Sequence, residues 1–123
     1  MTEIFRNTTR DTTLSERTRV ADTTVSRMVG LLSSKGLAEG EGLWIQPCNS
    51  IHTWFMRFTI DALFLDKENR VVKSVERMKP WRLTWIARRA IGVLELPEGC
   101  IAKTGTKVGD TLARERAQEK RAA

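Results

Sequence analysis

Short apolar runs separated by glycine, proline and charged turns dominate the chain, and this pattern predicts β-strands. The stretch 51–65 is longer than a usual strand of about five or six residues, so we expect a bend near 59–61 to divide it. A turn at 66–69 then reverses the chain in a hairpin. The expected strands are 4–7, 17–21, 43–45, 51–58, 62–65, 70–78, 91–96, 100–102 and 108–112.

One segment has helical spacing instead. Val25, Met28, Val29 and Leu32 recur at i, i+3, i+4 and i+7, which predicts an amphipathic helix over 24–33 with its apolar stripe packed on the sheet. We therefore predict a mainly β fold, a compact antiparallel sandwich or barrel of short strands with one packed N-terminal α-helix. Residues 1–112 are expected to form a single β-rich domain, and residues 113–123 a charged C-terminal tail.

Composition places the chain among ordinary globular domains with one core. It has 123 residues, of which 41% are hydrophobic and 29% are charged. No stretch approaches the roughly 18 apolar residues of a membrane span, and the N-terminus lacks the apolar run of a secretory signal. We therefore expect a cytoplasmic protein whose two cysteines are free thiols. The net charge of +6 favours anionic partners.

The most apolar long segment, 48–66, contains the only histidine of the chain and one of its two cysteines. We expect five of its side chains to surround a ligand-binding cleft: Cys48, His52, Met56, Arg57 and Asp61. The alternative is structural. In that case Met56 belongs to the core, Cys48 is a small buried thiol, His52 bonds a turn, and Asp61 caps a turn or pairs with Arg57.

The same segment suggests two kinds of chemistry that we do not predict. Cys48, His52 and Met56 are soft ligands that suit copper, but strand residues four apart are separated by roughly 13 Å, too far for one ion. Cys48, His52 and Asp61 are also the residue types of a thiol nucleophile, its base and its orienting acid. We predict no catalytic residue, no metal site and no cofactor.

The segment 70–89 is strongly basic, with seven cationic residues and one acid, Glu76. Cations beside aromatic side chains can hold phosphates while the rings stack on bases. The candidate polyanion-binding residues are Arg77, Lys79, Trp81, Arg82, Trp85, Arg88 and Arg89. Alternatively, the tryptophans cover the sheet edge and the charges are simply solvated. Glu95, in the next predicted strand, is expected to be a surface or paired carboxylate.

Four segments of the chain, in this order, are similar to one protein family. They are 27–32 (Arg-Met-Val-Gly-Leu-Leu), 51–61 (Ile-His-Thr-Trp-Phe-Met-Arg-Phe-Thr-Ile-Asp), 93–99 (Val-Leu-Glu-Leu-Pro-Glu-Gly), and Gly105 with Val108-Gly109-Asp110. Together they resemble the domain of unknown function 192 family, in its Ile-His-Thr branch. The resemblance implies a compact, mainly β domain of bacteria and archaea and no established activity. One departure is Thr59, where members of the family usually carry proline.

From these features we expect a non-enzymatic binding module that holds a small ligand or a protein partner in a cleft at the central segment. The alternative is a protein that binds nucleic acid or another polyanion through the loop 77–89. A second alternative is a small hydrolase or thiol enzyme. A pocket at His52 would favour the ligand-binding module, and a continuous positive face would favour the polyanion-binding protein. A contact between Cys48 and His52 would favour the enzyme.

Overall fold

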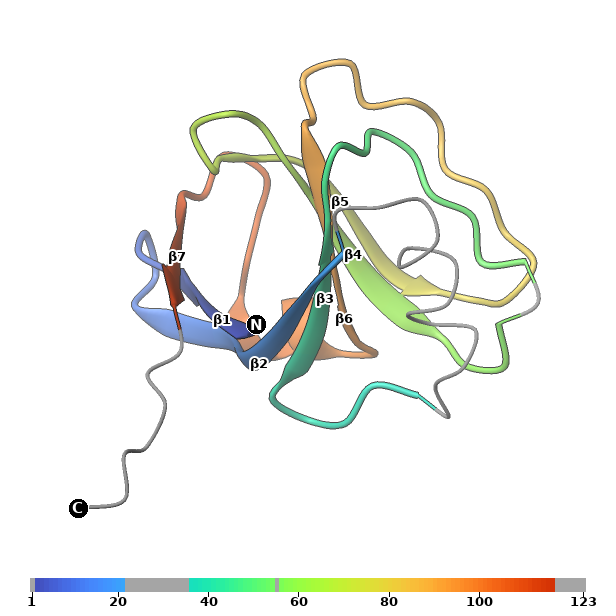
Figure 1. The fold of residues 1–123 in the computed structure, drawn as a ribbon, viewed down its shortest axis with the longest axis horizontal. Coiled ribbons are helices and arrows are strands. Elements are labelled where there is room, and N and C mark those ends of the chain that lie inside the picture. Colours follow the sequence, from blue (N-terminus) through green and yellow to red (C-terminus); the bar gives the residue numbers. More distant parts are fainter. Residues whose placement is uncertain (1, 22–35, 55, 117–123) are drawn as a thin grey trace.

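The computed structural model describes residues 2–21, 36–54 and 56–116 and consists mainly of β-strands (Figure 1). Its elements are β1 (Thr2–Asn7), β2 (Thr12–Ala21), β3 (Glu41–Ile45), β4 (Ile60–Leu65), β5 (Val71–Met78), β6 (Gly92–Pro97), α2 (Cys100–Thr104) and β7 (Leu112–Arg116). The predicted helix at 24–33 lies outside the described residues. The seven strands and the single short helix of the described residues confirm the mainly β class.

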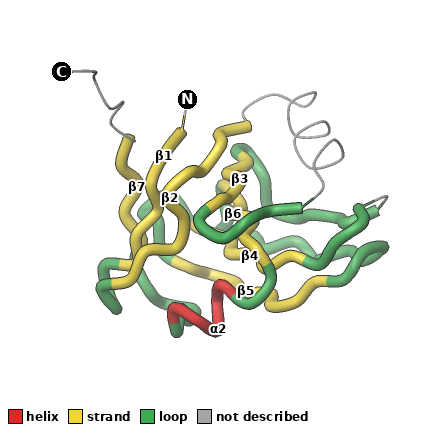
Figure 2. The backbone as a smooth tube through the Cα atoms, turned by 90° about the horizontal axis from the view of Figure 1, so that it is seen from below, coloured by secondary structure: helices red, strands yellow, loops and turns green. Residues whose placement is uncertain are grey.

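The strands form one curled sheet in the order β5-β4-β6-β3-β2-β1-β7 (Figures 1 and 2). An isolated bridge between Arg70 and Thr111 brings the chain just before β5 close to the chain just before β7, so the two ends of the sheet approach one another. All strand pairs are antiparallel except β2 and β3, which are parallel. A parallel pair needs a long connection, and 19 residues, 22–40, separate these two strands. The prediction of an antiparallel arrangement is therefore wrong for the β2–β3 pair.

The central strands are buried on both faces, which explains why they read as continuous apolar runs. On β4, Ala62 and Phe64 belong to one hydrophobic cluster, whereas Leu63 and Leu65 belong to the other. Trp44 on β3 is fully buried and lies against the backbone of β6. A Cβ atom at Gly92 would lie 2.3 Å from the Trp44 ring, so only glycine fits opposite this side chain.

Three of the predicted strands are wrong. Within the first of these, 51–58, the described residues, 51–54 and 56–58, are irregular, and among them only His52 forms a bridge, to Leu83. Residues 100–102 belong to α2, which begins after the left-handed Gly99 and ends at the left-handed Gly105. Residues 108 and 109 form a turn, Thr111 forms the bridge to Arg70, and β7 begins at Leu112 and pairs with β1 as far as Arg116. The sheet therefore extends four residues into the segment expected as a tail.

Strict alternation along a strand would place Val71 and Val75 on one face of β5, but the two side chains lie on opposite faces. Val71 packs in the cluster with Leu63 and Leu65, whereas Val75 packs against the cluster with Ala62 and Phe64. A register shift in the β4–β5 pairing, between Phe64 and Leu65, adds one residue to β5 and changes the face.

No helix among residues 2–21, 36–54 and 56–116 has the length and apolarity needed to cross a membrane.

Candidate functional site

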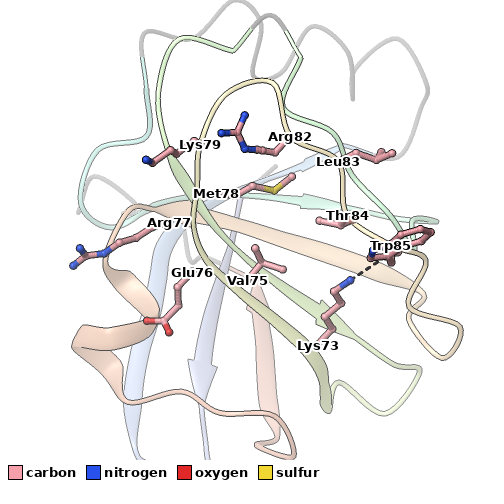
Figure 3. Close-up of a pocket in the computed structure, with 10 residues that line it drawn as sticks. All are labelled: Lys73, Val75, Glu76, Arg77, Met78, Lys79, Arg82, Leu83, Thr84 and Trp85. Carbon is pink, nitrogen blue, oxygen red and sulfur yellow. Dashed lines mark hydrogen bonds between the residues drawn. The ribbon is translucent and has the colours of Figure 1, made fainter.

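A groove of about 370 Å³ lies between the edge strand β5 and the loop that follows it (Figure 3). We call it the basic groove. Its residues are Lys73, Val75, Glu76, Arg77, Met78, Lys79, Arg82, Leu83, Thr84 and Trp85. Four of these are cationic and one is acidic. Val75 and Met78 lie between the strand and the loop, so the groove has an apolar floor and a positive rim.

Arg77 reaches the groove because β5 bulges there. From Ile60 to Ala62 on β4, the paired positions on β5 run from Met78 to Val75, so β5 contributes one extra residue. Arg77 consequently has a positive φ of 52°, which is uncommon for a residue other than glycine. The Asp61 carboxylate stabilises this conformation by accepting a hydrogen bond from the Arg77 backbone N–H at 2.9 Å.

The loop that forms the other wall is attached to residues 51–53 by a ladder of hydrogen bonds. The Thr53 N–H donates to the Arg82 carbonyl and the Trp81 N–H to the Thr53 carbonyl, both at 2.9 Å. The Thr53 hydroxyl donates to the Lys79 carbonyl at 2.6 Å and accepts from the Arg82 N–H at 2.9 Å. Thr53 is fully buried, so its side chain is committed to holding this loop.

The cations of the groove differ in how firmly they are held. The Lys73 ammonium donates to the Trp85 carbonyl at 3.1 Å and lies 5.4 Å from the centre of the Phe64 ring, so it is fixed at the wall (Figure 3). In contrast, the side-chain nitrogens of Arg77 and Lys79 make no hydrogen bond or ion pair within the described part of the chain. These two groups are available to a ligand.

The five residues predicted around a central cleft have different environments. His52 and Arg57 are exposed, and the His52 ring packs on Trp54 with 5.1 Å between centroids. Met56 is in the core, and Cys48 is half-buried and packs against the same cluster. Asp61 is fully buried. No hydrogen bond or ion pair joins any two of the five within residues 36–54 and 56–116, and none of them lines the basic groove. The central cleft stays a prediction.

Asp61 has the capping role named as its alternative. Its second oxygen accepts the backbone N–H of Ile101, near the start of α2, at 2.8 Å. The sequence could not reveal this contact, because 40 residues separate the two partners. One carboxylate therefore joins the start of α2 to the bulge that presents Arg77.

Neither cysteine has the surroundings of a reactive thiol. The Cys48 thiol donates to the Ser50 carbonyl at 3.0 Å, and it makes no hydrogen bond with His52 in the portion of the chain described. Burial raises the pKa of the Cys100 thiol to about 11, with a smaller contribution from the charge of Asp61. Nor do three or more His, Cys, Asp or Glu side chains gather as metal ligands among the described residues.

Glu95 differs most from its prediction as a surface or paired carboxylate. It is 2% exposed, and its Oε2 atom has no hydrogen-bond partner among residues 2–21, 36–54 and 56–116. The residues directly opposite it, Leu43 on β3 and Ala62 on β4, are apolar. Burial raises the pKa of the Glu95 carboxyl to about 8. The sequence pattern could not reveal this burial, because alternation along the strand also allows the Glu95 side chain to face solvent.

A second cavity, of about 690 Å³, lies between the start of β2, the end of β6 and α2. Glu16, Glu39 and Glu98 are among its lining residues, and Lys103 is the one cation there. Lys103 forms an ion pair with Glu39. This cavity is therefore net acidic, and the two cavities have opposite charge.

Comparison with known proteins identifies relatives without an assigned activity. The family model DUF192, described as "Uncharacterized ACR", matches residues 5–114. A UPF0127 protein of Pyrococcus horikoshii is 34% identical over 99 residues, which cover 76% of this chain and 84% of the relative. A UPF0127 protein of Pyrococcus furiosus is 32% identical over 111 residues, covering 86% of this chain and 93% of that protein.

Two solved structures share the fold. A protein of unknown function from Novosphingobium aromaticivorans superposes with a TM-score of 0.77 at 21% identity, over 92% of this chain and 84% of that one. A protein of Sinorhizobium meliloti has the same TM-score at 18% identity, over 91% of each chain. At these identities the likeness concerns the fold alone.

Proposed function

This chain belongs to the DUF192 family of uncharacterised proteins, and we propose that it is a binding module that holds a polyanion in the basic groove. The observation that carries the proposal is the grouping of Lys73, Arg77, Lys79 and Arg82 around one groove in which Glu76 is the single carboxylate. The proposal keeps the non-enzymatic binding role expected from the sequence. It moves the site from the central segment to the basic loop.

The geometry of the groove suits a chain of phosphates. Arg77 and Lys79 can form new charge-assisted hydrogen bonds without breaking existing ones, whereas Lys73 supplies a fixed charge at the wall. Trp85 is 88% exposed and offers a flat ring next to Lys73, whose ammonium donates to the Trp85 carbonyl. Aromatic faces next to cationic side chains are the combination that single-stranded polyanions with planar groups use.

The test is fluorescence anisotropy with a labelled single-stranded oligodeoxythymidine as the probe. Binding should weaken steeply between about 50 and 200 mM salt, because neutralised phosphates release counterions. The double variant Arg77→Gly/Lys79→Ala should reduce the slope of log affinity against log salt by about 1.4, or roughly 0.7 for each cation removed. Glycine is used at position 77 because it adopts the φ of 52° without strain.

The matched control is Lys67→Ala/Lys107→Ala, which removes two exposed lysines outside the groove. This control should retain most of the slope of the wild type. Equal losses in the two double variants would mean that net charge, not the groove, attracts the probe. The absence of binding at about 50 mM salt would contradict the proposed function itself.

A further inference from the structure

The large apolar side chains exposed by this protein are gathered on two neighbouring loops. Six such side chains occur among the described residues, and five of them are on the loops 52–54 and 81–86. Their exposed fractions run from 47% for Trp54 to 88% for Trp85. We call this set the apolar crest: Trp54, Trp81, Leu83, Trp85 and Ile86. The sixth, Val108, lies in the turn before β7.

The crest is a fixed part of the fold. The two loops run beside one another on the side of the molecule away from β1 and β7 (Figure 1), and the bridge between His52 and Leu83 joins them. Thr84, between two exposed residues of the crest, is buried and bonds to Ile51 through its N–H at 2.9 Å. Because Thr84 points inward, Leu83 and Trp85 on either side of it are held outward.

The charge around the crest is mainly positive, with Glu76 as the one carboxylate of the adjoining basic groove. The segments 48–60 and 77–94 contain no Asp or Glu. Arg57, Lys79, Arg82, Arg88 and Arg89 are all exposed in these two segments. A second copy of this chain that docked through its own crest would bring an equally positive surface against the first, and like charges would oppose that contact. A partner of complementary charge must therefore be anionic.

The apolar residues of the crest define the partner further. Single-stranded nucleic acid is held mainly by stacking on aromatic rings and by cations, and the exposed aliphatic side chains Leu83 and Ile86 add little to either contact. Tryptophan, leucine and isoleucine next to arginine and lysine are the composition of surfaces that lie in the interface of an anionic bilayer. We propose that the apolar crest inserts into the surface of an anionic lipid bilayer while the basic groove contacts headgroup phosphates. This inference rests on the proposed polyanion function.

The experiment is flotation of the full-length protein with vesicles of phosphatidylcholine alone or with roughly one-third phosphatidylglycerol. The protein should float with the anionic vesicles and remain behind with the neutral ones. Ile86→Ser should lower the partition coefficient by about tenfold, since it removes one inserted aliphatic side chain outside the groove. Adding Trp54→Ser should lower it further. Val108→Ser is the matched control, because Val108 is 60% exposed and lies outside the crest, and it should leave partitioning unchanged.

The oligonucleotide assay separates failure of this inference from failure of the proposed function. Ile86→Ser should bind the oligonucleotide as the wild type does. Wild-type protein that binds the oligonucleotide but not anionic vesicles would overturn the bilayer inference and leave the polyanion function standing. Binding to neither probe would overturn both. Equal flotation of wild type and Ile86→Ser, equal flotation with neutral vesicles, or self-association that Ile86→Ser abolishes would each overturn the bilayer inference.

Discussion

Replacing Glu95 with glutamine should remove a large pH dependence of stability. Glu95 is 2% exposed between Leu43 and Ala62, and its Oε2 atom lacks a hydrogen-bond partner within the described part of the chain. Burial raises the pKa of its carboxyl from 4.5 to about 8. Since one pKa unit corresponds to about 1.4 kcal/mol, ionising this carboxyl costs about 5 kcal/mol more in the folded chain than in the unfolded chain.

The direction of the effect follows from proton binding. Between pH 4.5 and about 8 the folded chain retains the Glu95 proton, whereas the unfolded chain releases it. The unfolded state therefore binds fewer protons, and the free energy of unfolding decreases as the pH rises through this interval. Above about pH 8 both states are ionised and the decrease ends. Glutamine is neutral throughout, so Glu95→Gln should match the wild type near pH 4.5 and exceed its stability by up to about 5 kcal/mol above pH 8.

Urea unfolding, followed by the fluorescence of the buried Trp44, measures this difference across the pH interval. Glu98→Gln is the matched control, because Glu98 is an exposed glutamate three residues further along the chain. It should follow the wild-type curve. The reasoning is refuted if wild type and Glu95→Gln lose stability in parallel as the pH rises, or if the variant is equally destabilised at every pH.

Three further outcomes are expected. Asp61→Ala should lower the free energy of unfolding by about 3 kcal/mol in urea titrations, because the buried N–H of Ile101 and the partly buried N–H of Arg77 lose a charged acceptor; stability within experimental error of the wild type would contradict its anchoring role. Met28→Asp should cost several kcal/mol if the predicted helix 24–33 packs on the sheet, and an unchanged melting temperature would contradict that helix. Arg88→Ala/Arg89→Ala should flatten the salt dependence of oligonucleotide binding, and an unaltered slope would exclude both arginines from the polyanion surface.

The hydrophobic pattern predicted the sheet well where strands are central. The expected strands at 43–45, 62–65 and 91–96 correspond to β3, β4 and β6, whose side chains are buried on both faces. The pattern failed at 51–58, which is as apolar as a strand. There the backbone groups of Ile51 and Thr53 form hydrogen bonds with the loop 81–84 and not with a neighbouring strand. The hydrophobic pattern indicates which residues are buried, and a loop packed on a core can bury its apolar residues as a strand does.

Short segments near the C-terminus were misassigned for a different reason. In 99–105 two glycines adopt left-handed conformations at either end of one helical turn, which the sequence pattern does not separate from a turn between strands. The β7 pairing with β1 joins the two ends of the described chain, and no local signal encodes a partner so distant. The bulge at Arg77 likewise depends on Asp61, 16 residues away.

The sequence predicted the positive charge of the candidate site but not the shape of the groove. Arg77, Lys79, Arg82 and Trp85 were expected from the basic segment, and all four line the groove. Lys73 was not among the candidates, and only the fold brings its ammonium to the Trp85 carbonyl. The burial of Glu95 could not be predicted, because the sequence gives the residue type at a strand position but not which parts of the chain cover that position.

The central segment and the basic loop, which the sequence presented as competing sites, are one structural unit. The Thr53 side chain and backbone hold the loop at Lys79, Trp81 and Arg82, and Asp61 holds the bulge at Arg77. The Ile-His-Thr segment therefore supplies positioning contacts, and the basic loop supplies the charged groups that a ligand can reach. Changes at Thr53 or Asp61 should alter polyanion binding through the geometry of the groove, even though neither residue lines it.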